Sequence, residues 1–284
     1  VCSRGGLPLS PEEGARLLEL LESPAAPVPY AGYGGILPMD GVRELYPIEL
    51  IKSAVCTLTG MSVSVKCASR TVGLLAEEAL SRLGCRFSEG GLTLQLSGDG
   101  RDVSVYDKVS DYIFTDRILA LVCMDLFRRG QDAAVPASSP RVLDRLAERW
   151  GRRALRYEDG FSSDSDRTAR SLGLRQPFLR DGLMLGIRLL SLLRENRCSL
   201  EELEDRLPGY AVVSRTVAAP RELLPGELGL CFPVEGGEIR IAPARGGRAL
   251  FLAAEGVSME AAGELCRFAE EELLNRHLPG ESKM

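Results

Sequence analysis

The chain has 284 residues, of which 45% are hydrophobic and 26% charged, a composition typical of folded globular proteins of about two domains. This composition excludes the disordered, collagen-like and disulfide-scaffold classes. The formal net charge of −5 argues against a nucleic-acid-binding surface, which is usually basic. We therefore expect a globular protein with no nucleic-acid partner.

The cysteines and the single histidine limit the possible chemistry. Eight cysteines form no C-x-x-C pair, so we interpret them as reduced core residues of a cytoplasmic protein and not as zinc ligands. No apolar run approaches the ~20 residues that span a bilayer, so we expect no membrane partner. His277 is the only histidine, which excludes any motif that needs an internal one.

The first 57 residues predict two helices joined by a linker. Ser10 is a candidate N-cap before Pro11 and two glutamates, so a helix is expected up to residue 22. Residues 23–41 are rich in proline and glycine, which is typical of a linker. A second helix is expected over residues 42–57, with an apolar stripe at Leu45, Ile48, Ile51 and Val55.

Strands and helices then alternate regularly. The pattern predicts strands at residues 61–66, 92–96, 103–107, 133–136 and 153–157, and helices at residues 72–83, 115–129 and 139–150, the second starting on a Thr115 cap. Such alternation predicts α/β layers around a largely parallel sheet.

The pattern changes after residue 157. Residues 158–180 break the alternation, and their polar first part is expected to be a mobile loop. Two helices are expected at residues 181–195 and 199–206, with Pro208 ending the second. The last part of the chain predicts a small α+β unit, with strands at residues 210–217, 238–242 and 249–255 and a helix at residues 258–276.

This order of elements resembles the α-D-phosphohexomutases, the phosphoglucomutase/phosphomannomutase family. The likeness is carried by residues 46–51, 61–66 and 74–84, by the turn Ser97-Gly98-Asp99-Gly100-Arg101-Asp102 between two strands, by Arg180-Asp181-Gly182-Leu183-Met184 and the helices after it, and by residues 239–255. The resemblance implies an α/β fold of consecutive phosphohexomutase-type α/β/α domains plus a small C-terminal α+β domain. The implied boundaries are 1–41 for the remnant of a first domain and a linker, 42–130 and 131–208 for two α/β domains, and 209–284 for the phosphate-loop domain.

The resemblance also implies a phosphorylated serine in a T-x-S-H-N-P loop of the first domain. That loop is not in this sequence, because its histidine would have to be His277. Residues 1–22 match the part of the first domain downstream of the loop. Either the serine lies on residues upstream of Val1 or the parent protein has lost it, and the missing initial Met favours a fragment.

The family's metal loop, D-x-D-x-D-R, corresponds to the turn at residues 97–102. Its three carboxylate positions become Ser97, Asp99 and Arg101, and its arginine position becomes Asp102. Mg²⁺ requires oxygen ligands, whereas Arg101 would repel the dication by about 8 kcal/mol at about 4 Å and an effective dielectric of about 20. A shifted register leaves Asp99 and Asp102 as the weak candidate metal ligands. No cofactor is expected unless this altered loop still binds Mg²⁺.

The two substrate loops of the family are altered as well. The sugar-binding G-E-x-S-G loop is missing, and Glu158, Ser162 and Ser163 are its candidate remnants. The phosphate loop R-P-S-G-T-E-P corresponds to residues 242–248, where Arg245, Gly246, Gly247 and Arg248 form a basic glycine-rich turn of the kind that binds anions. Arg180-Asp181-Gly182 is retained, and Asp181 is expected to cap the helix that follows.

These observations favour a region with a phosphohexomutase scaffold and eroded catalytic loops. We interpret it as a non-catalytic structural or regulatory part of a nucleotide-sugar biosynthesis protein, with an upstream nucleotidyltransferase domain in the same parent chain as its partner. One alternative is an active mutase that interconverts hexose 1- and 6-phosphates with an upstream serine. The other is a sensor whose partner is a phosphosugar.

Overall fold

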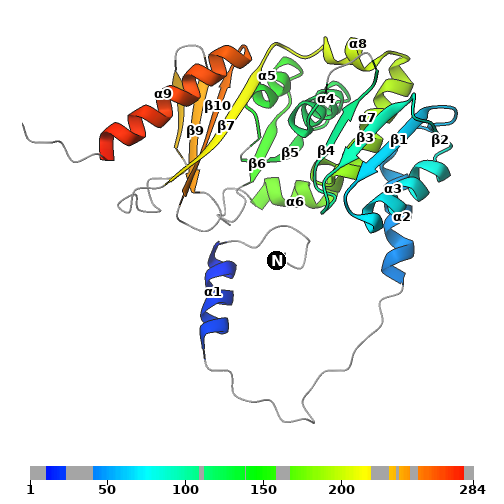
Figure 1. The fold of residues 1–284 in the computed structure, drawn as a ribbon, viewed down its shortest axis with the longest axis horizontal. Helices are drawn as coiled ribbons and strands as arrows, with labels where there is room; N and C mark the ends of the chain where they lie inside the picture. Colours follow the sequence, from blue (N-terminus) through cyan, green and yellow to red (C-terminus); the bar gives the residue numbers. More distant parts are fainter. Residues whose placement is uncertain are drawn as a thin grey trace, which may run out of the picture. The chain divides into compact units, whose positions relative to one another are not determined.

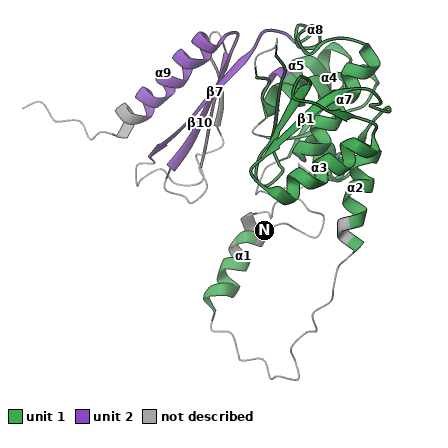
Figure 2. Ribbon diagram, turned by 45° about the vertical axis from the view of Figure 1, so that its right-hand side comes forward, with its two compact units in different colours: residues 1–139, 143–207 green, residues 140–142, 208–284 purple. Residues whose placement is uncertain are grey.

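The computed structural model describes residues 11–23, 41–108, 112–137, 139–157, 167–218, 230–234, 237–243 and 249–277. The chain divides into two compact units, residues 1–139 with 143–207 and residues 140–142 with 208–284 (Figure 2). Most of the two predicted α/β domains falls in the first unit, and the boundary between them stays a prediction.

The first unit alternates helices and strands in the predicted way (Figure 1). Its elements are α1 (Pro11–Glu22), α2 (Gly41–Ser53), β1 (Ser62–Cys67), α3 (Arg70–Arg82), β2 (Arg86–Phe87), β3 (Leu92–Leu96), β4 (Val103–Tyr106), α4 (Thr115–Arg128), β5 (Ala133–Pro136), α5 (Val142–Arg149), β6 (Ala154–Tyr157), α6 (Arg167–Arg175), α7 (Gly182–Asn196) and α8 (Leu200–Glu204).

A four-stranded sheet in the order β2-β1-β3-β4 forms the centre of this unit. Strand β1 is parallel to both β2 and β3, and only β4 is antiparallel to its neighbour. Val63, Leu94 and Val105 are buried, whereas Lys66 and Gln95 on the same strands are exposed. One face of the sheet therefore packs on helices, whereas Lys66 and Gln95 on the other face are open to solvent. The predicted α/β class with a largely parallel sheet is confirmed.

Helix α7 is the main packing partner of the sheet. It contacts β3 and β4 on one side and α2 and α4 on others, and it is buried along most of its length. Its N-cap is Asp181, whose carboxylate accepts a hydrogen bond of 2.9 Å from the Met184 backbone N–H. The predicted capping role of Asp181 is confirmed. The next helix, α8, begins with a capping box between Ser199 and Glu202.

The remaining strands of the first unit form a parallel pair, β5 and β6. Helix α6 contacts both strands, and Ala134, Tyr157 and Ala169 form the buried cluster between them. The sequence did not predict α6, because residues 158–180 were expected to lack regular structure. The side of α6 that faces the strands has the three- to four-residue spacing of a helix, at Ala169, Leu172 and Gly173.

The second unit is a four-stranded antiparallel sheet covered by one helix. The order is β7-β10-β9-β8, and α9 contacts β7, β9 and β10 (Figure 1). Ile239, Leu252, Ala254, Cys266 and Ala269 form its core. The predicted α+β arrangement is observed, with the bounds β7 (Ala211–Ala218), β8 (Leu230–Val234), β9 (Gly237–Pro243), β10 (Ala249–Gly256) and α9 (Met259–His277).

Several predicted details differ from the structure. Leu45 and Ile48 in the predicted apolar stripe of α2 are exposed, and the helix buries Pro47 and Leu50 instead. Thr115 does not cap α4. Its hydroxyl donates to the Val103 carbonyl and accepts from the Val103 N–H, which ties the helix start to β4. Helix α5 begins at Val142, not at residue 139, and the short strands β2 and β8 were not predicted.

The prediction that the cysteines are core residues holds for only half of those that the structure describes. Cys56, Cys67, Cys85, Cys123, Cys198 and Cys266 are free thiols, and three of them are buried. Within the described ranges, each helix is too short or too polar to cross a membrane. The location of the protein in the cell stays a prediction.

Leu94→Ala tests the contact between α7 and the sheet. Leu94 is fully buried, and its Cδ2 lies 2.7 Å from the position that a Cβ on Gly186 of α7 would take. The truncation should lower the free energy of unfolding by about 2–5 kcal/mol, because it leaves a cavity at this contact. Gln95→Ala on the exposed face of the same strand should change it by less than about 0.5 kcal/mol. Urea denaturation measures both values, and equal losses would contradict this packing.

Candidate functional site

The turn at residues 97–102, which the sequence resemblance predicts to be the counterpart of the family's metal loop, connects β3 to β4. The Ser97 N–H donates to the Asp102 carbonyl at 3.0 Å, and the Gly100 N–H donates to the Ser97 carbonyl at 3.0 Å. Gly100 has a φ of +74°, in the left-handed region that favours glycine. The backbone of the turn is therefore closed by its own hydrogen bonds.

The side chains of this turn also bind one another. The Ser97 hydroxyl donates to Asp99 Oδ1 at 2.7 Å, and the Arg101 backbone N–H donates to the same oxygen at 3.2 Å. The Asp102 N–H donates to Ser97 Oγ at 3.0 Å. The hydrogen bond from Ser97 is the main cause that lowers the pKa of Asp99. Asp99 is thus a carboxylate whose hydrogen-bonding capacity is partly used within the turn.

Arg101 lies where a third carboxylate would be needed for a metal. Its Nε is 3.8 Å from Asp99 Oδ2 in an exposed ion pair, so a cation already occupies the vicinity of Asp99. In the part of the chain that the structure describes, no group of three or more His, Cys, Asp or Glu side chains converges as metal ligands. The donor set of this turn does not fit Mg²⁺, which is coordinated by carboxylate oxygens and water.

A hollow of about 230 Å³ lies beside the turn. Asp99, Gly100 and Arg101 line it together with side chains from α2, α3 and the start of α7, namely Tyr46, Val72, Leu75, Arg180, Asp181 and Leu183. The structure thus brings Asp99 to this hollow, whereas Asp102 is not part of its lining. Two aspartates and two arginines balance its charge, so it is not an acidic metal-binding cavity.

Tyr46 and Asp181 form the most buried polar contact of the hollow. The Tyr46 hydroxyl donates to Asp181 Oδ2 at 2.8 Å, while Oδ1 of the same carboxylate caps α7. Burial, and then the negative charge of Asp181, raise the pKa of Tyr46. Burial also raises the pKa of Asp181, although the Tyr46 hydrogen bond opposes that shift. The pair joins α2 to the start of α7.

The start of α7 lies directly against the turn. The Gly182 N–H donates to the Gly100 carbonyl at 2.9 Å. A Cβ on Gly182 would lie 2.7 Å from the carbonyl carbon of Asp102, closer than side chains approach backbone. Glycine is required here because of this close approach. The retained Asp181-Gly182 pair therefore positions the turn and does not itself mark a reactive group.

The sequence did not identify Tyr46 or Arg180 as residues of this hollow. Tyr46 is 135 residues away from its partner Asp181, and no local pattern links the two. The other candidate residues, Glu158, Ser162, Ser163, Arg245, Gly246, Gly247 and Arg248, lie outside the described residues. Their assignments stay predictions.

Tyr46→Phe should raise the pKa of Asp181 further, because the ring keeps the carboxyl buried but no longer donates a hydrogen bond. The folded state already binds this proton more tightly than the unfolded state. The contribution of Asp181 to the free energy of unfolding is therefore largest below its ordinary pKa of 3.8. It falls as the pH rises from there through the folded-state pKa. In the variant, the decrease in the contribution of Asp181 to stability should extend to higher pH.

Carboxyl NMR titration measures the Asp181 pKa in both proteins. The variant should also lose about 1–3 kcal/mol of stability, because a carboxylate oxygen loses its donor. Tyr112→Phe, at an exposed tyrosine away from the hollow, is the matched control and should leave the Asp181 pKa unchanged. An unchanged or lower Asp181 pKa in Tyr46→Phe would contradict the described contact.

Comparison with known proteins gives structural matches only. No family model matches the sequence, and no curated protein matches it. A phosphoglucomutase/phosphomannomutase family protein from Burkholderia thailandensis superposes with a TM-score of 0.64 at 18% identity, over 84% of this chain and 65% of that one. A proposed phosphomannomutase from Thermus thermophilus gives 0.63 at 15% identity, over 95% and 73% of the two chains.

A third solved structure is a eukaryotic mutase. The N-acetylphosphoglucosamine mutase of Aspergillus fumigatus, in complex with GlcNAc-6P and magnesium, gives a TM-score of 0.52 at 14% identity, over 81% of this chain and 70% of that one. The chain spans about two thirds of the Burkholderia protein's length. At these identities the matches establish the fold and not the activity. The chain has the fold of the phosphoglucomutase/phosphomannomutase proteins, the α-D-phosphohexomutases.

Proposed function

We propose that this chain is a phosphohexomutase-like region that has lost its catalytic loops and acts as a structural or regulatory part of a nucleotide-sugar biosynthesis protein. The observation that carries the proposal is the turn at residues 97–102. The one carboxylate of the turn that lines the hollow, Asp99, accepts hydrogen bonds from Ser97 and Arg101 and pairs with the Arg101 side chain. A mutase needs Mg²⁺ to neutralise the charge of the transferred phosphoryl group.

The sequence supports the same proposal from a second direction. A serine loop of the family type contains a histidine, and His277 is the only histidine of this chain. Loss of a nucleophile by itself is compatible with a serine elsewhere in the parent protein. The three carboxylate positions of the metal turn hold Ser97, Asp99 and Arg101. Residues elsewhere in the parent protein do not account for this change, because the turn lies inside the chain.

The chemistry left to this hollow is binding. Arg101 and Arg180 are arginines that can bind an anion with two parallel hydrogen bonds, but Asp99 and Asp181 balance their charge at close range. Arg180 also donates to the Gly173 carbonyl at 2.8 Å, which uses part of its guanidinium. These contacts favour a structural role over a phosphosugar sensor.

Restoring the carboxylates tests whether the turn has lost a metal site. Ser97→Asp with Arg101→Asp recreates three carboxylates at alternate positions, and it should give saturable Mg²⁺ binding with a Kd of about 1 mM or tighter. The unmodified chain should show none. Isothermal titration calorimetry with Mg²⁺ measures both. Gln95→Asp with Arg82→Asp changes the charge equally at exposed positions outside the turn, and it should behave as the unmodified chain does.

Two results of these titrations would contradict the proposal. One is saturable Mg²⁺ binding by the unmodified chain that Asp99→Asn abolishes, because the turn would then still be a metal site. The other is saturable heat on titration with mannose 1-phosphate, which would establish the sensor alternative in place of a structural role.

A further inference from the structure

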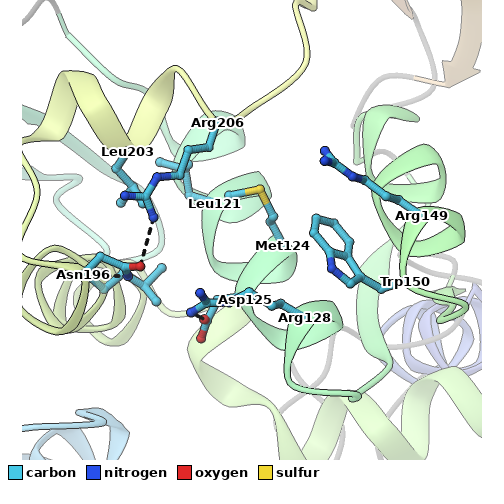
Figure 3. Close-up of a pocket in the computed structure, with 10 residues that line it drawn as sticks. Leu121, Met124, Asp125, Arg128, Arg149, Trp150, Asn196, Leu203 and Arg206 are labelled. Carbon is cyan, nitrogen blue, oxygen red and sulfur yellow. Dashed lines mark hydrogen bonds and ion pairs between the residues drawn. The ribbon is translucent and has the colours of Figure 1, made fainter.

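A second hollow, of about 340 Å³, lies among the C-terminal parts of four helices in the first unit (Figure 3). We call it the Trp150 pocket; its lining is Leu121, Met124, Asp125 and Arg128 of α4, Arg149 and Trp150 at the end of α5, Leu192 and Asn196 of α7, and Leu203 and Arg206 at α8. Leu192 and Asn196 follow the start of α7 by about three to four turns, which places them roughly 17–23 Å along the helix from Asp181. It is therefore separate from the hollow beside the turn.

The base of the Trp150 pocket is apolar. Leu121, Leu192 and Leu203 are buried, and Met124 is partly buried. Trp150 is the only tryptophan of the chain, and it is half-buried. In Figure 3, Trp150 and Arg149 lie along one side, Arg206 and Asn196 along the other, and Met124 between them. The pocket thus offers an indole and a thioether, two groups that contact aromatic rings favourably.

The rim of the pocket is cationic although the whole chain is acidic. Arg128, Arg149 and Arg206 are exposed, and Asp125 is the one carboxylate in the lining. Asp125 is already shared, because Arg128 and Arg129 donate to its two oxygens at 2.8 and 2.6 Å. An anion entering the pocket thus meets more positive than negative charge.

Two of these arginines have no carboxylate partner in the described part of the chain. Arg206 donates to the neutral Asn196 side chain at 2.9 Å, and the Arg149 guanidinium lies 5.2 Å from the centre of the Trp150 ring. Basic residues in the last turn of a helix stabilise it, which accounts for Arg128 on α4 and Arg149 on α5. That effect does not explain why three arginines from different helices meet the sole tryptophan around one hollow.

We propose that the Trp150 pocket binds a nucleoside monophosphate. The base would lie against Trp150 and Met124, and the phosphate would bind the guanidinium groups of Arg206 and Arg149, whose planar geometry matches phosphate oxygens. The volume lies at the lower end of the ~300–1,000 Å³ of small-molecule sites, which suits one nucleotide and not a dinucleotide. This inference does not depend on the proposed loss of mutase activity.

Trp150 supplies a specific readout, because the fluorescence of the only tryptophan reports on this pocket. Titration of the chain with AMP and with UMP should give a saturable emission change with a Kd between about 10 µM and about 1 mM for at least one of them. Ribose 5-phosphate, which lacks the base, and adenosine, which lacks the phosphate, should bind at least about tenfold more weakly, because each lacks one of the two recognised groups.

Arg206→Gln and Arg149→Gln should each weaken nucleotide binding about tenfold or more. Arg82→Gln, at a similarly exposed arginine that pairs with Glu78 on α3, is the matched control and should leave the Kd unchanged. Far-UV circular dichroism identical to that of the unmodified chain verifies that each variant is folded.

Three outcomes would overturn the proposal. The first is the absence of a saturable change with both nucleotides up to about 5 mM. The second is binding that neither Arg206→Gln nor Arg149→Gln weakens. The third is ribose 5-phosphate binding as tightly as the nucleotides, which would make the site a general phosphate site without recognition of a base.

Discussion

The close contact between Gly182 and the turn at residues 97–102 sets the geometry of the first unit. Because the residue at 182 has no side chain, the start of α7 approaches the backbone of Asp102, and the Gly182 N–H binds the Gly100 carbonyl. From there α7 extends across β3 and β4, and Asp181 at its start holds Tyr46 of α2. One helix end thus fixes the turn, the sheet and a helix that lies more than a hundred residues earlier in the chain.

Under the proposed loss of the catalytic loops, this arrangement explains how the fold can persist while the turn changes. The backbone hydrogen bonds and the close approach of Gly182 do not depend on which side chains occupy positions 97, 99 and 101. Ser97 and Asp99 add side-chain hydrogen bonds to the backbone N–H groups of Asp102 and Arg101. Once the carboxylates are replaced, Ser97 and Arg101 satisfy Asp99 locally. A metal is then not needed to neutralise repulsion between neighbouring carboxylates, so the turn is stable without one.

The sequence predicted the starts of α7 and α8, because their capping residues Asp181 and Ser199 act locally. It failed where a side chain is used by a distant partner. Thr115 looks like a cap, but its hydroxyl binds the backbone of Val103. The contact of Tyr46 with Asp181 and the gathering of three arginines around Trp150 depend on tertiary packing, which no local pattern records. The resemblance supplied the fold, which the comparisons confirm, and the assignment of residues 97–102 as an altered metal turn stays a prediction.

The most direct test of the central claim is the conversion of mannose 1-phosphate and glucose 1-phosphate by the complete natural protein that contains this chain. The reaction would contain glucose 1,6-bisphosphate and Mg²⁺, and ³¹P NMR would follow the hexose 6-phosphate formed. If the catalytic turn is lost, the 6-phosphate should form no faster than in a reaction without the protein. Mg²⁺-dependent formation of the 6-phosphate, abolished by Asp99→Asn, would contradict the account.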